Sequence, residues 1–125
     1  MNRQLKLKRR IRTDYYELHA VHDSIFLWLT EAEGANKMKI ADLFCYFHLA
    51  SLRPVMQRRI EKLEFEGKII TILSLSPYEI ICLRKCLQAN GYNFYLTNVL
   101  AKVDQTFTFF NHFIETFPSS LTLEE

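Results

Sequence analysis

At 125 residues, the chain has the length of one ordinary domain and is long enough to bury a hydrophobic core. Apolar residues make up 49% of it and charged residues 24%, with only three Gly and three Pro, which excludes a disordered chain and favours helix. No apolar run is long enough to span a bilayer, the N-terminus lacks the apolar block of a signal peptide, and the three cysteines do not form a disulfide-like framework. We therefore expect one domain over residues 1–125, a cytoplasmic location and no membrane partner.

The net charge is only +2, but the basic residues are concentrated at the N-terminus. Residues 1–12 hold six of the sixteen basic residues and no acidic residue, so the remainder carries ten basic and fourteen acidic residues. A basic arm on a mildly acidic body is typical of a protein that binds a polyanion, and the alternative is a solvated, frayed terminus. The basic residues of this arm are Arg3, Lys6, Lys8, Arg9, Arg10 and Arg12.

Two helices are predicted before residue 37. The first, over about residues 3–20, is predicted from one apolar stripe at helical spacing, formed by Leu7, Ile11, Tyr15 and Leu18. A second helix over residues 25–32 can be capped at residue 23 or 24 and ends at Gly34. Because no Gly or Pro lies at the join, the two helices can also be one.

Residues 37–69 follow the pattern of a helix-turn-helix. A helix over residues 41–48 precedes Ser51, a preferred N-cap residue, and Pro54 falls in the first turn of the next helix, where its missing N–H costs little. This second helix covers residues 52–66, and Gly67 ends it. The β-branched residues of the segment 68–75 then predict a strand, so that residues 37–75 form a helix-turn-helix followed by a strand.

The helix over residues 52–66 has an apolar face, formed by Met56, Ile60 and Leu63, and a basic face. Arg and Gln side chains match the edges of guanine and adenine in the major groove, while flanking cations contact phosphate. We therefore predict a DNA recognition helix, and the alternative is an amphipathic surface helix with solvated charges. The predicted DNA-binding residues are Ser51, Arg53, Gln57, Arg58, Arg59 and Lys62.

Two further helices are predicted after the strand. Ser76 and Pro77 begin one that runs to Gln88, and the last covers about residues 96–117, with a polar, loose tail over 118–125. The last helix carries a heptad seam that is broad and aromatic, so we expect the segment 94–117 to pack partly against a second copy or another protein. The predicted dimer interface consists of Leu7, Ile11, Tyr15, Leu100, Val103, Phe107, Phe110, Ile114 and Phe117.

The block SLRPVMQRRIEKLEFEGKI at residues 51–69 resembles the winged helix-turn-helix of MarR-type regulators. The recognition helix of that family ends in the pattern I-x-x-L-E-x-x-G-hydrophobic, which is matched by Ile60, Leu63, Glu64, Gly67 and Ile69. The length and the aromatic-rich, Gly-poor composition are similar to the smaller SarA/Rot branch. The resemblance implies a mainly α fold, a winged helix-turn-helix with N- and C-terminal dimerisation helices, and a homodimeric transcription regulator that binds double-stranded DNA.

The wing of that family is a β-hairpin with a basic tip, and here it is short or absent. No Arg or Lys lies between Thr71 and Leu83, so contact with the minor groove would fall to the N-terminal arm. Two alternatives therefore remain open. One is a protein–protein adaptor that holds its partner through the aromatic stripe, and the other is a phage or plasmid replication-type DNA-binding protein.

No pattern in the sequence predicts catalysis or a cofactor. The sequence holds no Gly-rich phosphate loop, no nucleophile elbow and no H-E-x-x-H motif. Two pairs at helical spacing, Cys45 with His48 and Cys82 with Cys86, have the chemistry of a metal site or a redox switch. Because helical cysteines are most often small buried apolar residues, we expect no metal site and no enzyme.

Overall fold

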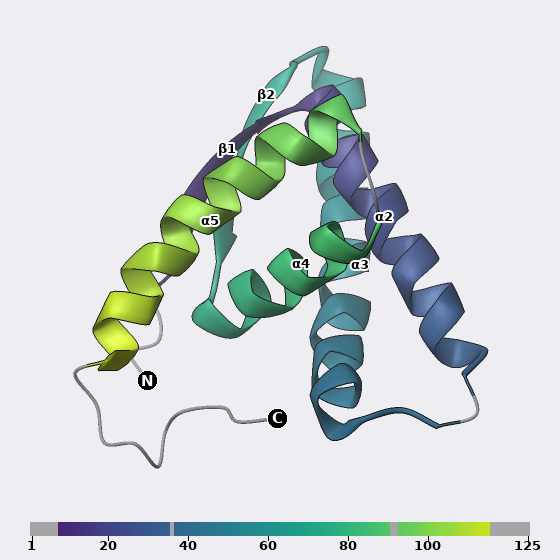
Figure 1. Ribbon diagram of the computed structural model, residues 1–125. Helices are drawn as coiled ribbons and strands as arrows, with labels where there is room; N and C mark the ends of the chain where they lie inside the picture. The colour runs from purple at the N-terminus through teal and green to yellow at the C-terminus, as the bar shows by residue number, and fades with distance from the viewer. Residues whose placement is uncertain (1–7, 36, 91–92, 116–125) are drawn as a thin grey trace.

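The computed structural model describes residues 8–35, 37–90 and 93–115, and for residues 107–115 it describes the backbone only. This part of the chain is mainly helical, as predicted, with a small two-stranded sheet (Figure 1). The elements in chain order are β1 (Arg9–Asp14), α2 (Tyr15–Glu33), α3 (Ile40–Glu66), β2 (Ile70–Leu75), α4 (Pro77–Ala89) and α5 (Phe94–Glu115).

The helix predicted over residues 3–20 is wrong for residues 9–14, which form the strand β1. This strand pairs antiparallel with all six residues of β2. Ile11 and Thr13 are buried, whereas Arg10 and Arg12 are exposed, which is the alternation of a strand with one face on the core. The apolar spacing suggested a helix, but pairing with a strand from the middle of the chain decides the backbone here.

A capping box at Asp14 sets the start of α2. The Asp14 N–H donates to Glu17 Oε1 at 3.0 Å, and the Glu17 N–H donates to Asp14 Oδ1 at 2.7 Å. The helix then continues without a break through the join between the two predicted helices and ends at Gly34. The sequence therefore carried the correct start signal, in the spacing of Asp14 and Glu17.

The turn predicted at Ser51 is wrong, because residues 40–66 form the single helix α3. Its buried residues succeed one another at spacings of four, three, four, four and three, in one stripe: Cys45, Leu49, Leu52, Met56, Ile60 and Leu63. A turn would shift this stripe out of phase, whereas one helix keeps it against α2 and α4 along its length. Ser51 is exposed inside the helix, and Pro54 lies in the interior rather than in a first turn.

The elements after α3 agree with the sequence prediction. Gly67 ends the helix in the left-handed region, with φ of 67°, and its N–H donates to the Glu64 carbonyl. The predicted strand is β2, and the helix predicted to begin after Ser76 is α4, with a capping box between Ser76 and Glu79. The last predicted helix is α5.

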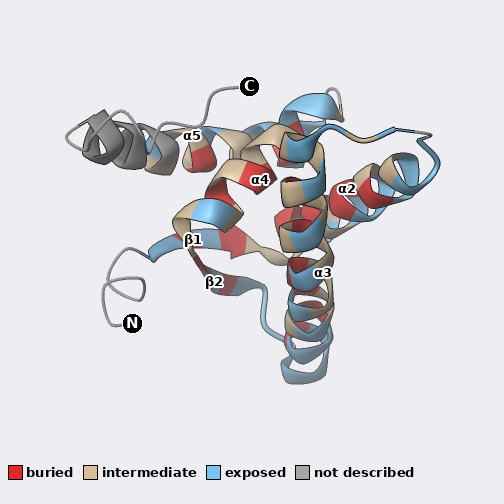
Figure 2. Ribbon diagram, turned by 90° about the horizontal axis from the view of Figure 1, so that it is seen from below, coloured by how far each residue is buried: buried red, intermediate tan, exposed pale blue. Residues whose placement is uncertain are grey.

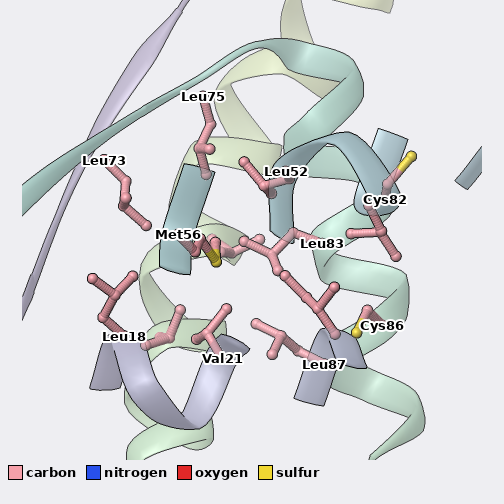
Figure 3. Close-up of a cluster of buried hydrophobic side chains, with 14 of the residues drawn as sticks. Leu18, Val21, Leu52, Met56, Leu73, Leu75, Cys82, Leu83, Cys86 and Leu87 are labelled. Atoms are coloured by element: carbon pink, nitrogen blue, oxygen red, sulfur yellow. The ribbon is translucent and has the colours of Figure 1, made fainter. Parts of the chain in front are cut away.

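The core lies where α4 meets α2, α3, α5 and β2. Figure 2 shows the buried residues on the inner sides of these elements, while the end of α3 that leads into β2 is largely exposed. Figure 3 shows the side chains converging: Leu18 and Val21 from α2, Leu52 and Met56 from α3, Leu73 and Leu75 from β2, and Cys82, Leu83, Cys86 and Leu87 from α4.

Replacing Ser51 separates a continuous α3 from a helix that starts at this residue. In a helix interior, Ser51→Ala raises the free energy of unfolding by about 0.5 kcal/mol, because alanine has the higher helix propensity. As an N-cap, the same change would lower it by about 1 kcal/mol. Pro54→Ala adds a second measurement, since relief of an interior proline raises stability by up to about 3 kcal/mol. Urea denaturation measures both, and a loss of stability in both variants would contradict the single helix.

The two helix-ending glycines give a matched pair of variants. Gly67→Ala is expected to lower the free energy of unfolding by about 1 kcal/mol, because a side chain is strained at a φ of 67° even though no atom crowds the new Cβ. Gly34 has a φ of −82°, so Gly34→Ala is expected to be neutral or to stabilise by up to about 1 kcal/mol. Thermal unfolding of both variants tests the difference, and equal effects would contradict it.

Candidate nucleic-acid interface

Strand β1 presents a row of cations. Arg10 and Arg12 point to the exposed face because their neighbours Ile11 and Thr13 face the core, and Lys8 and Arg9 are exposed at the start of the strand. The C-terminal part of the predicted basic arm, from residue 8 onward, is therefore held in a defined geometry. Arg3 and Lys6 lie outside the described residues.

A groove of about 560 Å³ runs between β1 and α5. Figure 1 shows α5 lying along β1, which forms one wall of this groove. None of its described lining residues is acidic and five of them are basic, so this lining suits a chain of phosphates. The lining residues are Lys8, Arg9, Arg10, Ile11, Arg12, Lys102, Gln105 and Thr106.

Lys102 joins the two walls of the groove. Its Nζ donates to the Arg12 carbonyl at 2.7 Å and to Glu17 Oε1 at 3.1 Å. Glu17 is 5% exposed, so its charge is largely withdrawn from water and balanced by this lysine. Lys102 thus fixes α5 against β1 and α2, while much of its own charge is neutralised.

The groove residues on α5 were not predicted from the sequence. Lys102, Gln105 and Thr106 stand more than ninety residues after Lys8 and belong to a helix whose apolar seam dominated its pattern. A lysine facing away from such a seam gives no local sign of a ligand. Only the packing of α5 along β1 brings these residues to the basic strand.

The predicted recognition residues lie on the second half of α3. Ser51, Arg58 and Lys62 are exposed, and Arg59 is half-buried. The other two have partners within the chain. These are Arg53, whose guanidinium lies 6.0 Å from the centre of the Phe26 ring, and Gln57, whose Nε2 donates to Glu61 Oε2 at 3.1 Å. None of the six is among the described residues that line the groove at β1, so they lie on a separate surface.

The predicted dimer seam is partly enclosed by its own chain. Ile11 and Val103 are 3% and 0% exposed, respectively, and belong to the core, which corrects their predicted place on a surface. Leu100 packs on the core, and the Tyr15 hydroxyl donates to Glu64 Oε2 at 2.5 Å. The remaining predicted residues are not described as side chains: Leu7 and Phe117 lie outside the described residues, and Phe107, Phe110 and Ile114 have a described backbone only.

A second, shallower hollow of about 550 Å³ lies beside α2, where the chain passes from α4 to α5. Tyr16 stacks on Tyr95 there, with ring centres 6.0 Å apart, and His19 Nδ1 lies 3.4 Å from Asp23 Oδ2. The sequence did not predict it, because its two sides are about seventy residues apart. Nothing in its lining adds a cation to the basic surfaces.

The three cysteines are buried in the core and carry reduced thiols. A hydrogen bond with Cys45, aided by burial, raises the pKa of Cys82, and burial raises the pKa of Cys86 to about 11. Among the residues described, no cluster of three His, Cys, Asp or Glu side chains is arranged to hold a metal ion. Within the same residues, every helix is too short or too polar to cross a bilayer.

Comparison of the chain with protein-family models, with curated proteins and with solved structures gives no significant match. Its surfaces must therefore be interpreted from their own geometry and charge.

The thiols are expected to resist alkylation while the protein is folded. The raised pKa values of Cys82 and Cys86 leave little of their thiolate at neutral pH, and burial blocks access to all three thiols. Iodoacetamide is therefore expected to modify them only as fast as the chain opens. Ser51→Cys places a thiol at an exposed site on the same helix as Cys45 and serves as the reactive control. Mass spectrometry over time measures the rates, and rapid native modification of Cys82 or Cys86 would contradict their packing.

Proposed function

We propose that the protein binds double-stranded DNA, and the observation that carries the proposal is the cationic groove between β1 and α5. Four exposed basic residues of β1 and its start line this groove, and none of the lining residues that the structure describes is acidic. Phosphate contacts supply most of the non-specific affinity for DNA, and Arg side chains make them with paired donors. A rigid basic strand suits this contact better than a frayed arm, because less side-chain and backbone entropy is lost on binding.

The second half of α3 supplies a candidate for base contacts. Arg58 and Lys62 are exposed on the C-terminal half of α3, and Figure 2 shows that the end of this helix is largely exposed and extends beyond the other helices. A helix of this width fits the major groove, where an arginine pairs with guanine. The likeness of residues 60–69 to the end of a MarR-type recognition helix supports the same assignment. Sequence-specific regulation of transcription by a homodimer, acting in the cytoplasm, is the function we propose on this basis.

The proposed binding mode differs from that of a winged helix-turn-helix. The helix before the recognition segment is continuous with it, so α3 approaches DNA as one rod that carries its contacts at the C-terminal half. The antiparallel pair of β1 and β2 takes the place of a wing, with the cations on the strand that comes from the N-terminus. Phosphate contact from β1 and base contact from α3 would then have separable effects.

Removing two charges from the groove tests the phosphate contact. Arg10→Ala with Arg12→Ala is expected to weaken binding to all duplex sequences and to reduce the slope of log K against log salt by about 2. Lys37→Ala with Lys39→Ala removes the same charge from an exposed segment before α3 and is the matched control. Fluorescence anisotropy with random duplexes at several salt concentrations measures both. Equal slopes for the two double variants would contradict a DNA-binding groove.

Base readout has its own variant and its own measurement. Arg58→Ala should lose sequence preference, seen as weaker enrichment in a selection from random duplex DNA, while its salt slope falls by about 1. If the wild-type protein enriches no sequence but binds duplexes in a salt-dependent way, base readout by α3 is contradicted and only the phosphate contact by β1 remains. Absence of any salt-dependent binding would overturn the proposed function as a whole.

An adaptor that binds another protein is the second candidate, and a specific surface favours it. The N-terminal half of α3 exposes Ile40 and Phe47, at 87% and 61%, respectively, beside the partly exposed Leu43. Exposed apolar residues on one helix side are typical of protein contacts. Loss of DNA binding in every assay above, with retained folding, would favour this candidate.

A further inference from the structure

The register of the sheet, together with two hydrogen bonds of β1 to groups outside the sheet, shows which backbone groups of β2 face away from β1. In an antiparallel pair, the N–H and C=O of one residue point to the same side, and successive residues alternate. Asp14 lies opposite Ile70, yet its N–H donates to Glu17 instead of crossing the sheet. The same alternation therefore directs the backbone groups of Ile70, Ile72 and Ser74 away from β1.

The two outer edges of this sheet differ in what covers them. The outer edge of β1 is covered, because α5 lies along it and Lys102 Nζ donates to the Arg12 carbonyl. The outer edge of β2 meets no third strand in the described part of the chain. Figure 2 shows β2 on the side of the sheet away from α5, and Ile70 and Ile72 are 49% and 45% exposed.

The open edge also lacks the features that normally prevent pairing. Proteins protect free strand edges with lysine, with proline, with bulges or with a covering segment. The strand β2, with the sequence ITILSL, contains no charged residue and no proline, whereas β1 has three arginines in six residues. All six residues of β2 pair in regular register with β1, so no bulge twists this edge away.

We infer that the protein forms a twofold homodimer in which the free edge of β2 pairs with the same edge of a second copy. The result is one antiparallel sheet in the order β1-β2-β2-β1, and the twofold axis passes beside Ile72. Ile72 then faces Ile72 of the second copy, and Ile70 faces its Ser74. The uncharged sequence of β2 allows two copies to approach at this edge, whereas the outer edge of β1 carries three arginines and is covered by α5.

The apolar surface continues beyond the strand itself. A standard interface buries about 800 Å² on each partner, more than the edge of six residues supplies alone. Phe65 and Ile69 stand just before β2 and are 92% and 60% exposed, respectively. Because they lie just before β2 in the chain, these exposed side chains would add apolar area to the contact with a second copy.

This dimer gives the proposed DNA-binding function its twofold symmetry, but the inference rests on the sheet alone and does not depend on DNA. The two basic strands become the outer strands of the joined sheet, separated by three strand spacings, or about 14 Å. The interface lies apart from the predicted seam, two of whose residues are in the core.

Sedimentation velocity over a range of concentrations, without DNA, tests the inference. The wild-type protein is expected at twice the 14.9 kDa of the chain. Ile72→Lys places two like charges opposite each other and is expected to raise the dimer dissociation constant about 100-fold or more. Phe47→Lys adds the same charge at a comparably exposed apolar residue on α3 and is expected to remain dimeric.

A crosslink provides a second measurement that does not depend on a charge in the strand. Ile72→Cys is expected to give a covalent dimer with a short bifunctional maleimide, whereas Ile40→Cys, at an exposed site on α3, is not. A monomeric wild type, or a dimer that survives Ile72→Lys and gives no crosslink at residue 72, overturns the inference. A dimer that Phe47→Lys dissociates instead would place the interface on α3 and overturn it equally. DNA binding is measured separately, so its failure leaves these outcomes unchanged.

Discussion

The pairing of β1 with β2 is the constraint on which the rest of the structure depends. It joins residues 9–14 to residues 70–75 and so closes the chain around α2 and α3. The last residue of β1, Asp14, is also the N-cap of α2, so the sheet sets where the first helix begins and in which direction it leaves. Lys102 then binds both the edge of β1 and the buried Glu17, which places α5 against the same junction. Without this pairing, the groove would have no wall.

The strand β1 therefore contributes both to the stability of the core and to the positive charge of the groove. The alternation of β1 commits Ile11 and Thr13 to the core and leaves Arg10 and Arg12 on the surface. The fold tolerates the mutual repulsion of these cations for two reasons. The inner face of β1 buries apolar side chains, and the backbone of β1 pairs with that of β2. A bound polyanion would remove that repulsion, so binding and folding stability are coupled, and a ligand that binds only the folded state stabilises it further.

The continuity of α3 follows from the phase of its apolar residues. Its buried stripe runs from Cys45 to Leu63 without a shift, and α2 and α4 pack along it. A proline within a helix costs about 3 kcal/mol, but burying one large apolar side chain returns about 1.5–3 kcal/mol, so an unbroken stripe of six outweighs Pro54. The N-cap preference of Ser51 is a local signal of about 1 kcal/mol and is overruled by the same packing.

The sequence by itself determined the elements whose signals are local. The C-cap glycine Gly67, the capping box at Ser76, the β-branched run of β2 and the inward apolar faces of α4 were all readable, because each depends on a few adjacent residues. Tertiary structure alone decided that residues 9–14 are a strand, since the strand's partner lies some sixty residues away and the spacing of the apolar residues indicated a helix. It also decided that Lys102 joins the basic groove and that, among the described residues, β2 pairs with a strand along one edge only. These features arise from contacts between distant segments, which backbone propensity and spacing do not encode.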